Sequence, residues 1–100
     1  MKVTTMVFVR VYVTESSHLL NKIIHYLKNE AKIRGVSVFR AVSGFGETSE
    51  HSALMLDLSL DLPLAIEFFD LKTKIEPVLE YLSSIIKDEH VVFWEVKTNN

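Results

Sequence analysis

The spacing of hydrophobic residues switches repeatedly along this chain, and the order of those switches limits the fold more than any other feature. The segments with a period of two are 4–13, 36–43, 52–61, 64–69 and 91–97, and the segments with helical spacing are 18–31 and 73–86. Period two is typical of strands and period 3.6 of amphipathic helices. The order predicts an α+β fold, a ferredoxin-like βαββαβ sandwich, with an extra strand arm (52–61) between the second and third core strands.

Both predicted helices carry end signals. Gly35 stands where the first helix should stop, because glycine readily adopts the left-handed conformation that ends helices. Thr73 and Glu76 have the spacing of a capping box at the start of the second helix. Pro77 follows closely, which is tolerated near a first turn. We therefore expect the first helix to end at Gly35 and the second helix to begin at Thr73.

Several predicted strands are apolar on both faces, although two helices can cover only one face of a sheet. In 4–13 the valines alternate with Met6, Phe8 and Tyr12, and in 91–97 Trp94 alternates with Phe93. An open sheet face this apolar ordinarily meets another protein surface. The pattern predicts a homo-oligomer, and the alternative is a few exposed apolar side chains, which are common.

Composition argues against several classes of function. One hundred residues form a single domain, 1–100, and a formal charge of −2 argues against a nucleic-acid module built on basic charge. Cysteine is absent, which excludes disulfides and thiolate chemistry. The apolar runs are too short to insert into a membrane, and residues 1–10 do not resemble an export signal. We expect a cytoplasmic protein with no nucleic-acid partner and no direct membrane insertion.

The sequence Gly44-Phe45-Gly46, which closes the second strand, resembles the start of the mobile loop of PII signal-transduction proteins. The match is closer to a bacterial PII-like family known only as a domain of unknown function. The resemblance runs through 38–46, through a Ser and a His soon after, and through 58–63. It covers roughly residues 7–96.

The resemblance implies a homotrimer with ligand clefts between subunits, in which an adenine nucleotide is the expected class of ligand. It also implies that the loop contacts a partner such as a membrane transporter or an enzyme. The candidate ligand-binding residues are Arg40, Gly44, Phe45, Gly46, Glu47, Ser49 and His51.

The sequence also departs from the PII pattern. Glu47 stands where PII loops are basic, and residues 41–61 contain no Lys or Arg. The glycine-rich phosphate loop expected before the last strand is missing from 83–90. Phosphate sites favour bare backbone N–H groups and positive charge, so we expect any nucleotide to bind weakly.

Arg40 and the histidines are the remaining candidates for chemistry. Arg40 either faces a cleft or, as we favour, pairs with a carboxylate such as Glu67 or Glu95. The four histidines lack metal-ligand spacing, so we expect no metal site. No nucleophile motif or acid–base pair stands out, and we expect no enzymatic activity.

Three functions remain open. The first is a PII-like regulatory trimer that senses a small ligand and contacts a partner. The second is a structural or adaptor trimer without a small ligand. The third is a metal-handling trimer similar to the divalent-cation-tolerance proteins.

Overall fold

The computed structural model describes residues 1–44 and 61–100. Its elements follow in the order β1 (Val3–Thr14), η1 (Glu15–Ser17), α1 (Leu20–His25), η2 (Tyr26–Glu30), β2 (Ser37–Arg40), β3 (Pro63–Asp70), α3 (Lys72–Ile85) and β4 (Val91–Asn99). The core strands and both helices predicted from periodicity are therefore confirmed. Of the predicted strand arm 52–61, residues 52–60 lie outside the described residues, and Asp61 lies in a bend.

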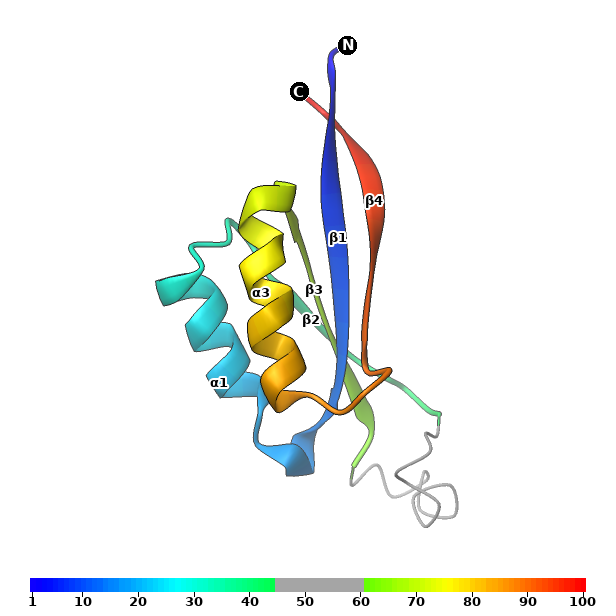
Figure 1. Ribbon diagram of the computed structural model, residues 1–100. Helices are drawn as coiled ribbons and strands as arrows, with labels where there is room; N and C mark the ends of the chain where they lie inside the picture. The colour runs from blue at the N-terminus through cyan, green and yellow to red at the C-terminus, as the bar shows by residue number, and fades with distance from the viewer. Residues whose placement is uncertain (45–60) are drawn as a thin grey trace.

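The four strands form one antiparallel sheet in the order β2-β3-β1-β4, which is the ferredoxin-like arrangement (Figure 1). The two helices lie on one side of this sheet, and the chain termini lie close together at one end. Val9, Val11 and Ile66 on the sheet are fully buried against Ile23 and Leu82 of the helices. Alternation in the strands and helical spacing in α1 and α3 thus meet in a single core.

The first helix ends before Gly35, contrary to the sequence prediction. After α1 the chain continues as the π-helical turn η2, and Lys32 then takes the left-handed conformation at a φ of 58°. The Ile33 N–H donates to the Leu27 carbonyl at 2.8 Å, a bond that spans the left-handed residue and closes the end of the helix. Ile33 is 7% exposed and belongs to the core, so the helix stops where this side chain must turn inward.

The second helix begins one residue before Thr73, and the predicted capping box is wrong. Its N-cap is Leu71, which has no side-chain capping bond. The Leu71 carbonyl accepts the N–H groups of Lys74 and Ile75, and the Asp70 carboxylate accepts the Leu71 N–H at 2.7 Å. Pro77 consequently lies inside the helix rather than in its first turn.

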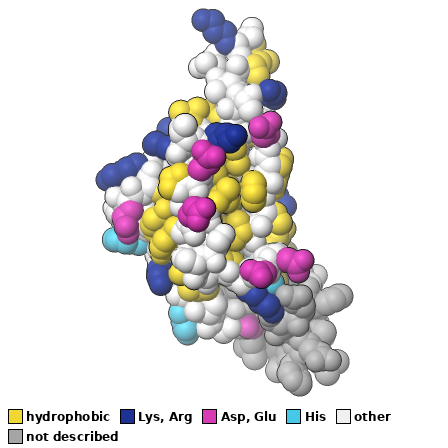
Figure 2. Space-filling model, viewed as in Figure 1, with side chains coloured by type: hydrophobic (Ala, Val, Ile, Leu, Met, Phe, Trp, Pro, Cys, Tyr) yellow, Lys and Arg dark blue, Asp and Glu magenta, His cyan; other side chains and the backbone are white. Residues whose placement is uncertain are grey.

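The side of the molecule that carries the helices is ordinary in composition. Figure 2 shows charged side chains of both signs around apolar side chains. Tyr26 and Tyr81 stack between the two helices, with ring centroids 3.7 Å apart. Phe93, on β4, also faces this side but stays 57% exposed, because β4 is an edge strand that lies beyond β1, away from both helices (Figure 1).

Candidate functional site

The sheet face opposite the helices carries a row of aromatic side chains. Phe8 lies directly opposite Phe69 on β3 and Trp94 on β4. The Phe8 ring stacks on the Trp94 ring, with ring centroids 4.8 Å apart, and on the Phe69 ring, with centroids 6.0 Å apart. Phe69 is 45% and Trp94 40% exposed. We call this face, with its row Phe69–Phe8–Trp94, the bare face.

Beside the aromatic row, Arg10 holds a polar network on the bare face. Its Nε donates to Glu67 Oε2 at 2.6 Å, and its Nη1 donates to the Tyr12 hydroxyl at 3.5 Å. The guanidinium carbon also lies 5.5 Å from the centre of the Trp94 ring, within cation–π range. The hydrogen bonds with Tyr12 and Glu67 raise the pKa of Arg10, so its charge is permanent and is balanced by Glu67.

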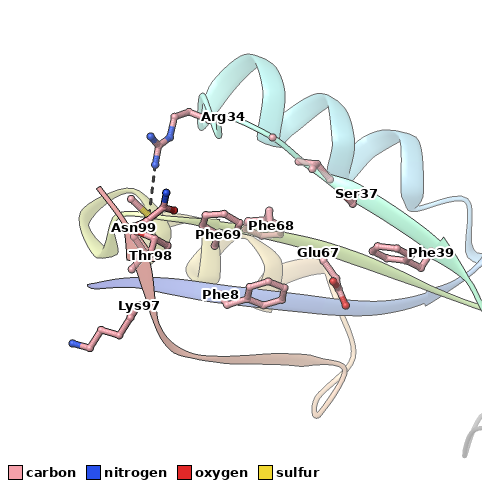
Figure 3. A pocket seen from close by; sticks show the side chains of 13 residues that line it. Phe8, Arg34, Ser37, Phe39, Glu67, Phe68, Phe69, Lys97, Thr98 and Asn99 are labelled. Carbon is pink, nitrogen blue, oxygen red and sulfur yellow. Dashed lines mark hydrogen bonds between the residues drawn. The ribbon is translucent and has the colours of Figure 1, made fainter. Parts of the chain in front are cut away.

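A groove of about 880 Å³ crosses one end of the bare face. Its lining comes from all four strands and from the loop before β2: Met6, Phe8, Arg34, Gly35, Val36, Ser37, Phe39, Glu67, Phe68, Phe69, Lys97, Thr98 and Asn99. We call it the sheet-face groove. Figure 3 shows Phe8, Glu67 and Phe39 along the strands, with Arg34 reaching toward the ends of β1 and β4.

The groove combines apolar rings with a few polar groups, which is the usual make-up of a small-molecule site. Ser37 and Glu67 lie directly opposite each other on β2 and β3. Phe8 and Phe69, whose rings stack on each other, line the groove on one side of that pair, and Phe39 extends from β2 on the other side. Such a site suits a flat apolar group that also presents hydrogen-bonding edges.

Of the predicted site residues, Arg40 and Gly44 lie in the part of the chain that the structure describes. Arg40 stands at the end of β2 and pairs with Glu15 of η1. The expected pairing with Glu67 or Glu95 is therefore wrong, because strand register gives Glu67 to Arg10. Gly44 has a φ of +146°, a conformation that other residues rarely adopt.

The other five predicted site residues, Phe45, Gly46, Glu47, Ser49 and His51, lie outside the described residues. Neither Arg40 nor Gly44 lines the sheet-face groove. The sheet-face groove is therefore a candidate site separate from the predicted one. The sequence predicted only the apolar second face of the strands on which it lies.

Arg34, Ser37 and Glu67 line the groove but were not among the site residues predicted from the sequence. Alternation alone places Ser37 on the same face of its strand as Phe39, and Glu67 on the same face as Phe69. Period two does not state which residues of two strands lie opposite each other. The signal that brings them together is the β2–β3 register, Ser37 to Glu67 and Phe39 to Ala65.

Two further observations concern other classes of site. In residues 1–44 and 61–100 no three His, Cys, Asp or Glu side chains gather in a way that could hold a metal ion. No helix in the same described ranges is long and apolar enough to cross a membrane.

Comparisons with known proteins agree with this architecture. The model of the DUF190 family, described as "Uncharacterized ACR, COG1993", matches residues 6–98. A UPF0166 protein of Aquifex aeolicus (strain VF5) is 33% identical over 85 residues, which cover 80% of this chain and 81% of that protein.

Two solved structures share the fold. CPII, a nitrogen regulatory PII-like protein from Thiomonas intermedia K12, bound to ADP, AMP and bicarbonate, is 15% identical with a TM-score of 0.72, over 99% of this chain and 92% of that one. The structure of CPII from the same organism bound to ADP and bicarbonate gives a TM-score of 0.73 at 15% identity, over 99% and 93% of the two chains.

Proposed function

This chain belongs to the DUF190 family, and from that membership together with its bare aromatic face we propose that it is a PII-like regulatory protein that works as a homotrimer. In this proposal the trimer senses a small ligand, an adenine nucleotide, at the clefts between subunits. The ligand state is then read by a partner protein, such as a transporter or an enzyme.

The observation that carries the proposal is the exposure of aromatic rings on the bare face. Phe69, Trp94 and Tyr12 are 45%, 40% and 38% exposed in the single chain, and they lie on three adjacent strands. Burying apolar surface of this kind stabilises association. Arg10 and Glu67 already neutralise each other, so a second copy can cover this face without leaving an unpaired charge.

The sheet-face groove supports the ligand part of the proposal. It begins at Phe8 and Phe69 of the aromatic row and runs to Arg34, beyond the start of β2. A neighbouring copy that covers the rings would form a wall of this groove and turn it into a cleft between subunits. An adenine ring matches the flat apolar space between phenyl rings, and Ser37 and Glu67 offer hydrogen-bonding groups for its edge.

Light scattering and a thermal-shift screen test the proposal. The chain at micromolar concentration should have three times its mass of 11.5 kDa, whereas 11.5 kDa itself would refute the trimer. ADP and AMP should raise the melting temperature. A ligand present at 100 times its dissociation constant adds roughly 2.7 kcal/mol to the free energy of unfolding. A trimer that responds to no nucleotide would instead favour the structural or adaptor function.

A further inference from the structure

We infer that Arg34 recognises a negatively charged group, such as a phosphate, on the molecule that occupies the sheet-face groove. The inference rests on the proposed ligand-binding function and names the residue that reads the charge. The sequence pointed to Arg40, the cation nearest to Gly-Phe-Gly, as a ligand-binding residue. The inference instead assigns the contact with the charged group to Arg34, in the loop before β2.

The position of Arg34 is the first part of the argument. It lines the groove at the end where β3 stops, and its side chain is 64% exposed. The other arginine at the groove, Arg10, is bonded to Glu67, whose side chain lines it. Arg40 is paired with Glu15 away from the lining. Lys97 lines the groove, but its ammonium donates to the Thr5 hydroxyl at 2.6 Å.

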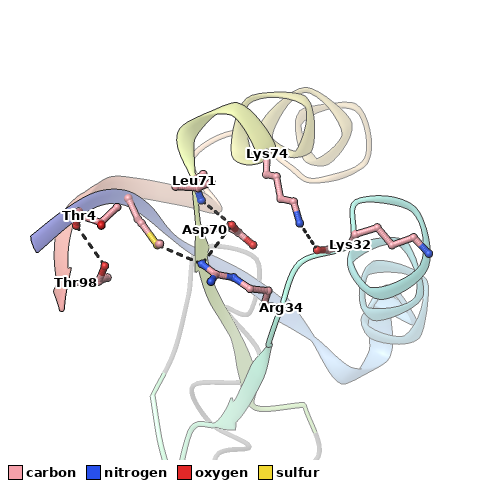
Figure 4. Close-up of polar contacts among 8 residues, drawn as sticks. Thr4, Lys32, Arg34, Asp70, Leu71, Lys74 and Thr98 are labelled. Atoms are coloured by element: carbon pink, nitrogen blue, oxygen red, sulfur yellow. Dashed lines mark hydrogen bonds and ion pairs between the residues drawn. The ribbon is translucent and has the colours of Figure 1, made fainter. Parts of the chain in front are cut away.

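The contacts of Arg34 leave most of its guanidinium accessible. Figure 4 shows one end of the group directed toward Asp70. Its Nη2 lies 3.6 Å from Asp70 Oδ1 and 3.6 Å from Met6 Sδ. Nη2 therefore donates one hydrogen bond to the Met6 sulfur. Charge-assisted N–H···O bonds are ordinarily about 2.7–2.9 Å long, so the contact with Asp70 is an ion pair without a close hydrogen bond. The remaining N–H donors form the planar fork that suits phosphate and carboxylate.

Asp70 explains why Arg34 stays in this place. Its side chain is 2% exposed, one oxygen accepts the Leu71 N–H, and the other has no hydrogen-bond partner. A buried carboxylate is costly unless a positive charge compensates it, and Arg34 supplies that charge. The attraction holds Nη2 at the end of β3 and directs the rest of the guanidinium toward the groove.

Calorimetric titration of the full chain with AMP and with adenosine tests the inference, because the two ligands differ only by the phosphate. Wild-type protein should bind AMP roughly ten times or more tightly than adenosine, as expected for a charge-assisted bidentate contact. Arg34→Gln should remove most of that preference and leave adenosine binding unchanged. Arg34→Lys, which keeps the charge without the fork, should show an intermediate preference.

Lys32→Gln is the matched control, because Lys32 is a cation two residues away that does not line the groove. It should keep the wild-type preference for AMP. An equal preference in Arg34→Gln and wild type, or an equal loss in Lys32→Gln and Arg34→Gln, would overturn the role of Arg34 while leaving nucleotide binding intact. A wild-type protein that binds neither compound would overturn the proposed function and this inference together.

Discussion

The carboxylate of Asp61 accepts two hydrogen bonds from Ser16, one from its backbone N–H at 3.1 Å and one from its hydroxyl at 2.8 Å. Arg40, at the end of β2, pairs with Glu15, the residue before Ser16. The turn η1 therefore holds the chain on both sides of residues 45–60.

Removing the Asp61 carboxylate should weaken the fold more than removing the Ser16 hydroxyl. We expect Asp61→Ala to lower the free energy of unfolding by about 1–2 kcal/mol and Ser16→Ala by about half as much, because only Asp61→Ala breaks both bonds. Urea denaturation of the two variants and wild type measures the difference. Equal losses would show that the backbone N–H contact contributes nothing.

The aromatic row should hold the proposed trimer together. We expect Trp94→Asp to yield a species of 11.5 kDa in light scattering, because a carboxylate buried between subunits without a partner is strongly disfavoured. Phe93→Asp is the control, since Phe93 is its neighbour on β4 but faces the helix-bearing side and is 57% exposed. A trimer that survives Trp94→Asp, or one that Phe93→Asp also dissociates, would place the interface elsewhere.

Gly44 and Gly35 should respond differently to an added methyl group. Neither has an atom within 4 Å of the position of a new Cβ, so backbone conformation alone decides the outcome. Gly44→Ala should cost about 1 kcal/mol or more, because its φ of +146° strains other residues. Gly35→Ala should change stability by less than about 0.5 kcal/mol or raise it slightly. Thermal unfolding with matched buffers compares the two, and a larger cost at Gly35 would contradict the argument.

Stability should fall at alkaline pH through Tyr26. Burial, with the nearby Glu30 and Tyr81, raises the pKa of Tyr26 above its usual value of 10.0. The folded chain therefore keeps this proton after the unfolded chain has lost it. The stabilising contribution is complete below pH 10 and is lost as the pH rises through the higher folded pKa.

Urea denaturation between pH 8 and pH 11 measures this contribution. Tyr26→Phe keeps the stack on Tyr81 but has no phenol to ionise, so its stability should decline less steeply above pH 10 than that of wild type. Parallel declines in the two proteins would assign the alkaline loss to other groups.

Local pattern alone determined the strands, the helices and the face on which each strand residue lies. Alternation placed Val9 and Phe8 on opposite faces, because successive strand residues point to opposite sides whatever the neighbouring strand is. The packing of the helices then made the Val9 face the core. Phe8 alternates with valines in its strand and Trp94 with Phe93 in the last strand, and this alternation predicted an apolar second face. These properties depend on spacing within a few residues, and a sequence displays such spacing directly.

The tertiary structure decided which side chains meet. Arg10 pairs with Glu67, 57 positions away, because the β1–β3 register places them opposite each other. Arg40 pairs with Glu15 because the path of η1 brings Glu15 to the end of β2. The first helical segment ends at Glu30 rather than at Gly35, and the left-handed Lys32 after it turns the Ile33 side chain into the core. The sheet-face groove likewise exists only once β2 lies beside β3, because its lining comes from segments far apart in the chain.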